Sequence, residues 1–162
     1  MKIFFWNFLL FIGVWTTAQV QTDIPMLKFE EVENKIGAFN KGVTVVNFWS
    51  TTCAPCVKEL PDFMVINEKH KNTPNFKMLL VSLDRSKDLD RVKKFLLDKN
   101  ITAEVVILDD IKRMNTWIPR YDADWGGEIP VTLFYVNGEK KLFHNGEISK
   151  EELDLTINQY LN

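Results

Sequence analysis

Residues 43–56 read VTVVNFWSTTCAPC, an apolar run that passes through a short polar turn into the only two cysteines of the chain. The apolar run is typical of a buried strand. The residues from Ala54 to roughly His70 can form a helix, which would place Cys53 at a helix N-terminus. There the unpaired N–H groups and the helix dipole favour a thiolate, lowering the pKa from about 8.5 into a range of about 3.5 to 7.5. Cys53 is therefore the candidate nucleophile.

Cys56 is the second half of the predicted reactive pair. It lies three residues after Cys53 and hence on the same side of the helix, where it can form or open a disulfide with Cys53. A zinc site and a structural disulfide are the alternative interpretations. Structural zinc needs about four ligands, and the chain adds only His70 and His144, which are far apart in the sequence. We therefore expect a redox-active dithiol and no metal site.

Two segments carry a resemblance to a known family. Residues 45–61 (VVNFWSTTCAPCVKELP) resemble the active-site segment of thioredoxin-fold proteins, most closely the TlpA/ResA-like periplasmic thiol-disulfide reductases. Residues 129–139 (IPVTLFYVNGE) resemble the cis-proline strand and following hairpin of that fold, and a helix-like stretch follows at 149–161. The resemblance covers about residues 28–161. It implies an α/β thioredoxin-like fold, in which helices flank a central mixed sheet.

The resemblance also implies a set of substrate-binding residues. Pro130 would follow a cis peptide bond and pack against the disulfide of Cys53 and Cys56. The backbone of Ile129 would then be free to pair with an extended substrate strand. Further substrate contacts are predicted at residues close to the cysteines or to the proline in sequence: Trp49, Ala54, Pro55 and Trp125. For Trp125, the alternative is that it packs an inserted segment against the sheet.

The proton-transfer group is less clearly marked in the sequence. Asn47 stands where cytoplasmic thioredoxins carry a buried aspartate, and an amide cannot titrate. Resolution of a mixed disulfide nevertheless requires Cys56 to lose a proton. Asp84 and Glu128 both flank predicted carboxyl ends of strands, where open α/β sheets place their sites. We therefore expect one of these carboxylates to accept the proton. Thr52, where many relatives have tryptophan, predicts an altered docking surface around the sulfur.

The rest of the chain alternates helical and strand patterns, which predicts a mainly parallel sheet with helices on both faces. The elements predicted in this way are 28–38 (helix), 76–83 (strand), 89–99 (helix) and 103–108 (strand). The strand-helix unit around 89–108 and the segment 109–127 form an insertion between the cysteine helix and the cis-proline strand. Glu59, on the cysteine helix, could also move protons, but it is interpreted as an ordinary charged surface residue because such residues are common near helix ends.

The N-terminus has the pattern of a secretory signal peptide. Lys2 supplies a positive charge, residues 3–15 are mostly apolar, and the small residue Ala18 ends the pattern. A membrane-spanning anchor needs about 20 apolar residues, so retention as an uncleaved anchor is the second interpretation. The predicted organisation is a signal peptide at 1–18, a lead-in at 19–27 and a thioredoxin-like domain at 28–162.

The composition agrees with one compact domain. The chain has 162 residues, of which 46% are apolar, and a net charge of −2. It is long enough to bury a sizeable core without disulfide cross-links. No basic patch interleaved with aromatic residues is present in the sequence, so nucleic-acid binding is not expected. We expect a monomer.

These features predict an exported, periplasmic thiol-disulfide oxidoreductase that works through a mixed disulfide. The resemblance favours the reducing direction. The Cys53–Cys56 pair would be the only redox group, without an organic cofactor. The expected partners are a disulfide-bearing protein substrate and, as the resemblance implies, a membrane-embedded electron donor that reduces the protein again.

Two other functions are compatible with the fold. Ser50 fits the hydroxyl position of the motif around the reactive cysteine of thiol peroxidases. That motif has a proline at the position where this chain has Val46. A copper carrier would use the two cysteines and a distal histidine, because soft thiolates select Cu(I). Such carriers space their cysteines by three residues, whereas this chain has two residues between them.

Overall fold

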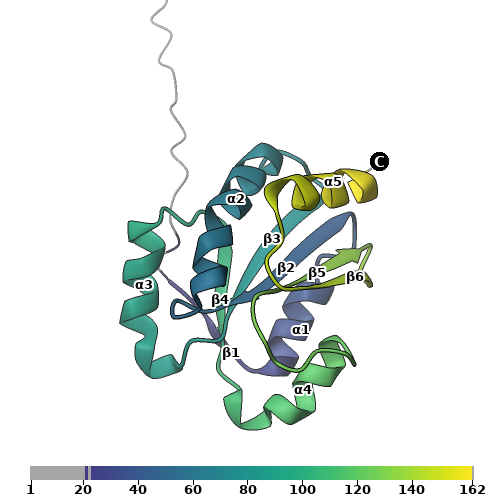
Figure 1. Cartoon of the computed structure of the whole chain (residues 1–162). Helices are drawn as coiled ribbons and strands as arrows, with labels where there is room; N and C mark the ends of the chain where they lie inside the picture. Colours follow the sequence, from purple (N-terminus) through teal and green to yellow (C-terminus); the bar gives the residue numbers. More distant parts are fainter. Residues whose placement is uncertain (1–20, 22, 162) are drawn as a thin grey trace, which may run out of the picture.

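The computed structural model describes residue 21 and residues 23–161 of the chain. The described residues form a six-stranded sheet in the order β1-β4-β3-β2-β5-β6, with helices on both faces (Figure 1). The strands are β1 (Met26–Leu27), β2 (Val43–Trp49), β3 (Phe76–Ser82), β4 (Glu104–Leu108), β5 (Val131–Val136) and β6 (Glu139–Asn145). The α-helices are α1 (Phe29–Gly37), α2 (Ala54–His70), α3 (Leu89–Asp98), α4 (Met114–Tyr121) and α5 (Lys150–Leu161), and the 3-10 turns are η1 (Ser86–Asp88) and η2 (Ile111–Arg113).

The thioredoxin-like fold is confirmed. Strands β1, β4, β3 and β2 are parallel, while β5 and β6 run antiparallel to their neighbours. The predicted helices and strands are present, with ends that differ by a single residue. The inserted segment 109–127 contains η2 and α4, which the sequence pattern did not predict.

The two faces of the sheet bury separate hydrophobic cores. Alternate residues of a strand point to opposite faces. In β2, Val45 and Trp49 belong to the core covered by α2, α3 and α5, whereas Val46 and Phe48 belong to the core covered by α1 and α4. Because helices cover both faces, β2 is buried along its whole length.

The parallel strands place the cysteines at one edge of the sheet. β2, β3 and β4 are neighbours and end at the same edge. The turn after β2 leads into Cys53. This turn therefore lies close to the segments that follow β3 and β4. This edge is where open α/β sheets carry their binding sites.

Part of the segment predicted as a lead-in, 19–27, belongs to the folded domain. β1 pairs with β4, and Ile24 is buried. The side-chain amide of Gln21 exchanges hydrogen bonds with the backbone of Val105, at 2.9 and 3.0 Å. The predicted signal peptide, 1–18, lies outside the described residues. Within residues 21 and 23–161, no helix has the length and apolar character needed to cross a membrane.

A chain that starts at Lys28 is expected to be less stable than one that starts at Gln21. The shorter chain lacks β1 and loses the burial of Ile24, which by itself contributes about 1.5–3 kcal/mol. Urea unfolding of the two truncated proteins measures the difference. Equal free energies of unfolding would show that β1 adds nothing to the domain.

Candidate active site

The two cysteines form a disulfide at the start of α2. Cys53 is the N-cap residue, with an extended backbone, and the helix begins at the next residue. The N–H of Cys56 donates to Sγ of Cys53 at 3.3 Å. Cys56 is fully buried, whereas Cys53 is partly exposed. The accessible sulfur is therefore the one that faces the N–H groups of the helix, an arrangement that suits a nucleophile.

The cis-proline loop lies against the disulfide. The Ile129–Pro130 peptide bond is cis, as predicted. β5 begins at the following residue, Val131, which lies opposite Phe48 in the antiparallel pairing with β2. This register brings the carbonyl oxygen of Ile129 to 3.6 Å from Sγ of Cys53. Two segments separated by 76 residues thus form one site.

Three of the predicted substrate contacts are accessible beside the disulfide. Ala54 is exposed, and Pro55 and Ile129 are partly exposed. Pro130 is buried. A substrate that reaches Cys53 can therefore meet the first turn of α2 on one side and the backbone of Ile129 on the other. The roles of these residues stay predictions.

The two tryptophans predicted to contact substrate are buried instead. Trp49 is 0% exposed, and its ring centroid lies 5.3 Å from that of Phe95. Trp125 is 4% exposed and packs on Phe48, with the ring centroids 4.9 Å apart. Its indole N–H donates to the carbonyl oxygen of Glu128 at 2.7 Å. The prediction of a substrate-facing role is wrong for both; Trp125 instead packs the inserted segment against the sheet.

Glu59 is a buried carboxyl group close to the cysteines. It is 3% exposed and follows Cys56 by three residues on α2, so the two side chains share a helix face. Nδ2 of Asn47 donates to its Oε1 at 2.8 Å, and the N–H of Ile148 donates to its Oε2 at 3.0 Å. Burial raises the pKa of Glu59 from 4.5 to about 7, although both hydrogen bonds oppose the change. The interpretation of Glu59 as a surface residue is therefore wrong.

Glu59 is connected to both the cis-proline strand and the surface. Asn47, which holds its carboxyl group, also donates to Oγ1 of Thr132 in β5 at 3.1 Å. A hollow of about 370 Å³ borders Glu59, and its lining includes the exposed residues Lys58 and Glu147. These two side chains form an ion pair at 2.6 Å. The hollow therefore brings solvent-accessible space up to the buried carboxyl group.

Asp84 is held in its ionised form. The N–H and hydroxyl of Thr51 donate to its carboxylate at 2.8 and 2.6 Å, and Arg91 donates at 2.8 Å. Burial alone would raise the pKa of Asp84, but hydrogen bonds from Thr51, Arg91 and Ser82 outweigh it and hold the pKa below its usual range. A lowered pKa makes Asp84 a weaker proton acceptor at neutral pH, and its role in proton transfer stays a prediction. Through its hydrogen bonds with Thr51, Asp84 stabilises the turn that leads into the cysteines.

Glu128, the other predicted proton acceptor, is exposed and accepts a hydrogen bond from Asn145. Glu128 is thus not buried, in contrast to Glu59. Glu59 is buried, lies one helical turn from Cys56 and has a pKa near neutrality.

The fold and the site together define a thioredoxin-like protein with a CxxC disulfide at a helix start. A model of the AhpC/TSA family matches residues 20–141, and the chain belongs to this family. A crystal structure of a thiol:disulfide interchange protein of the thioredoxin family from Chlorobium tepidum TLS has a TM-score of 0.63 at 21% identity, covering 77% of this chain and 83% of the other. This likeness concerns the fold.

Two curated proteins are distant relatives. Sporulation thiol-disulfide oxidoreductase A of Bacillus subtilis (strain 168) is 30% identical over 103 residues, which span 61% of this chain and 61% of that protein. Thiol-disulfide oxidoreductase ResA of Bacillus cereus (strain ZK / E33L) is 29% identical over 137 residues, which span 83% of this chain and 70% of that protein.

Replacement of Glu59 by Gln is expected to flatten the pH dependence of stability. Because the pKa of Glu59 is raised by folding, its contribution is complete below about pH 4.5 and is lost as the pH rises through about 7. The loss amounts to at most about 3 kcal/mol. Urea unfolding of the oxidised wild type and of Glu59→Gln between pH 4 and pH 8 measures this loss of stability.

Glu68→Gln, an exposed position on the same helix, is the control, and its free energy of unfolding should follow that of the wild type. Parallel curves for Glu59→Gln and the wild type would contradict the assignment.

Replacement of Asp84 by Asn is expected to destabilise the protein at neutral pH. The change weakens the acceptor for several buried donors, which typically costs about 1–3 kcal/mol. Because folding lowers the pKa of Asp84, the stabilisation exists above its usual pKa and disappears as the pH falls through the native pKa. The difference in free energy of unfolding between the variant and the wild type should therefore shrink toward pH 2.

Asp98→Asn, a change at an exposed position on α3, is the control. A difference that stays constant from pH 7 to pH 2 would show that the ionised form of Asp84 is not what stabilises the turn.

Proposed function

We propose that the protein is an exported thiol-disulfide oxidoreductase that acts as a disulfide reductase on proteins. The observation that carries the proposal is the position of the Cys53–Cys56 disulfide between a helix N-terminus and the cis-proline loop, with Glu59 buried behind it. The names of the two curated relatives, both thiol-disulfide oxidoreductases, support the reaction class.

The first step is attack of the Cys53 thiolate on one sulfur of a substrate disulfide. A bond forms between Sγ of Cys53 and that sulfur, and the other substrate sulfur leaves as a thiolate that takes a proton from solvent. The N–H of Cys56, which points at Sγ of Cys53, stabilises the thiolate before the attack. The exposed edge of the Ile129 backbone positions an extended substrate strand beside the sulfur.

The second step is attack of Cys56 on Sγ of Cys53. The Cys56 thiol first gives its proton to the ionised carboxyl group of Glu59. The resulting thiolate forms a bond to Sγ of Cys53 and displaces the substrate sulfur bonded there, which leaves as a thiolate and takes a proton from solvent. The products are the Cys53–Cys56 disulfide and a substrate with two thiols, so two electrons have passed to the substrate. Glu59 then returns the proton to solvent through the hollow beside Lys58 and Glu147.

The cycle closes when a dithiol donor reduces the disulfide. In the proposed setting, the N-terminal 18 residues direct export and are removed near Ala18, or stay as an anchor, and the donor is embedded in the membrane. The N-terminal sequence pattern supports export, and the resemblance supports a membrane-embedded donor.

The arrangement around the cysteines favours this activity over a thiol peroxidase. The Ser50 hydroxyl, at the position expected for a peroxidase, contacts the hydroxyl of Thr52 at 3.0 Å and donates to the carboxylate of Asp84 at 3.4 Å. It is thus engaged with the turn before Cys53. For the copper carrier, no group of three or more His, Cys, Asp or Glu side chains suited to a metal occurs among residues 21 and 23–161.

Single-turnover reduction of insulin disulfides tests the proposed roles. Cys53→Ser should abolish the reaction, and Cys56→Ala should accumulate a mixed disulfide with the substrate. Glu59→Gln should slow release of the reduced substrate at pH 7 by about 10²-fold, and it should remove the limb near pH 7 from the pH–rate profile.

Glu68→Gln serves as the matched control, since it changes an exposed carboxylate on the same helix. A Glu59→Gln protein with an unchanged pH–rate profile would remove Glu59 from the mechanism. Peroxide turnover, or binding of one Cu(I) per chain, without insulin reduction would replace the proposed function by one of its alternatives.

A further inference from the structure

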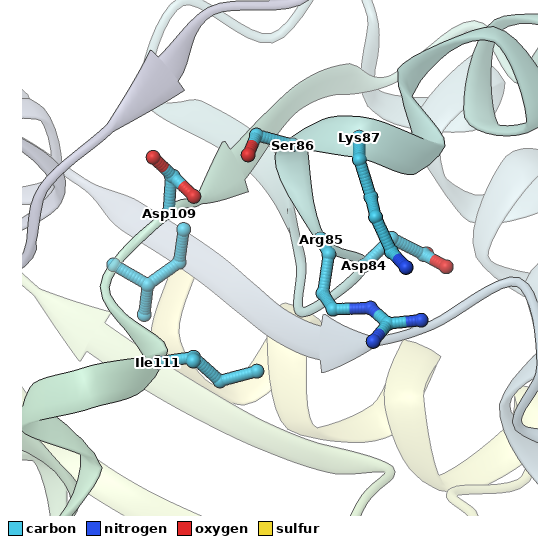
Figure 2. Close-up of a pocket in the computed structure, with 7 residues that line it drawn as sticks. Asp84, Arg85, Ser86, Lys87, Asp109 and Ile111 are labelled. Atoms are coloured by element: carbon cyan, nitrogen blue, oxygen red, sulfur yellow. The ribbon is translucent and has the colours of Figure 1, made fainter.

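Two adjoining hollows lie where β2, β3 and β4 end. One, of about 410 Å³, is lined by Thr52, Arg85 and Ile111 among others. The other, of about 240 Å³, shares Arg85 and Ile111 with the first and continues to Asp109 (Figure 2). We call the two hollows together the strand-end groove. The groove follows the carboxyl edge of the sheet and reaches Thr52, the residue that immediately precedes Cys53 in the sequence.

The cationic side chains of the strand-end groove are exposed, whereas most of its carboxylates are buried or partly buried. The side chains of Arg85 and Arg91 are 60% and 47% exposed. Lys87 is exposed and has no acidic partner within the described part of the chain. In contrast, the side chains of Asp84 and Asp88 are 0% and 19% exposed. Both are paired with Arg91, and Asp88 is also paired with Arg85 at 3.3 Å. The lining of the two hollows holds three cations and three carboxylates, but the cations are the more exposed, so a ligand meets Arg85, Lys87 and Arg91 first.

The opposite side of the groove offers an apolar contact. Figure 2 shows Arg85 and Lys87 on one side of the hollow, with Asp109 and Ile111 on the other. Ile111 is 52% exposed and supplies an apolar side chain to the lining of both hollows. The carboxylate of Asp109 is paired with Lys28 at 3.0 Å, which offsets its charge.

The distance along the chain from the reacting sulfur to the groove is short. Thr52 is small and exposed, and it is both the neighbour of Cys53 and part of the groove lining. An extended polypeptide advances about 3.3 Å per residue. A substrate segment held at Cys53 therefore passes Thr52 and enters the groove within a few residues of its own cysteine.

We propose that the strand-end groove binds the segment of the protein substrate that flanks its disulfide, and that this segment carries an acidic side chain for Lys87 and Arg85 and an apolar side chain for Ile111. The inference rests on the proposed function, because it takes Cys53 as the attacking group. It adds the substrate class: disulfides with acidic residues nearby in the sequence.

Formation of the mixed disulfide by the Cys56→Ala protein tests the proposal. The probes are peptides with a single cysteine capped by 2-mercaptoethanol, and they carry Glu, Gln or Lys at the positions three residues to either side. The Cys53 thiolate attacks the peptide sulfur, forms the protein–peptide disulfide and releases 2-mercaptoethanol as its thiolate. Mass spectrometry follows the adduct. Each rate is divided by the rate of the same variant with hydroxyethyl disulfide, which has no flanking residues.

The Glu peptide is expected to react about fivefold faster than the Lys peptide at low ionic strength, with Gln between them. This preference should fade in 0.5 M salt, because exposed charges are screened. An added Lys87→Glu change should cancel or reverse it. Lys41→Glu, the same charge change at the opposite end of β2, should preserve it.

Equal relative rates for the three peptides would overturn this inference and leave the proposed function intact. Failure of Cys53 to react even with hydroxyethyl disulfide would overturn both. If a second copy of the chain fills the groove instead, sedimentation would show a dimer that Lys87→Glu dissociates, and the peptide preference would be absent. That outcome also overturns the inference.

Discussion

The antiparallel pairing of β2 with β5 is the constraint on which the site depends. Asn47 lies opposite Thr132, and Phe48 lies opposite Val131. A slip of one residue would turn every side chain of one strand to the other face of the sheet. The amide of Asn47 would then leave the carboxyl group of Glu59, and the cis-proline loop would move away from the disulfide. The register of these two buried strands thus positions both the cis-proline loop beside Cys53 and the amide of Asn47 that holds Glu59.

Two buried carboxyl groups near this site have opposite properties because their partners differ. Glu59 receives hydrogen bonds from an amide and a backbone N–H, and these neutral donors do not compensate for burial. Asp84 receives hydrogen bonds from Thr51 and Ser82 and a charged contact from Arg91, which together outweigh burial. One group can therefore exchange a proton near neutral pH, while the other stays charged and holds the turn. Arg91 comes from α3, so the inserted strand-helix unit supports the active turn directly.

Local patterns in the sequence were sufficient for much of this site. The strand, turn and helix around Cys53 follow from residues that are adjacent in the chain, and the cis bond at Pro130 follows from the resemblance of a short segment. Glu59 was missed because a charged residue near the end of a helix is ordinarily a solvated surface residue. Its burial comes partly from Ile148, which lies 89 residues further along the chain. The α4 helix, with a proline near its end, also gave too weak a pattern to predict.

The sequence by itself determined the fold class, the order of most elements and the identity of the two sulfurs, because these depend on hydrophobic periodicity and on motifs of a few residues. The tertiary structure alone decided which carboxyl group has a pKa near neutrality, that Trp49 and Trp125 are buried, and that the ends of three parallel strands enclose a groove that reaches Thr52. Each of these properties depends on burial and on partners brought together from distant parts of the chain. Neither burial nor such partners can be read from the residues next to a position.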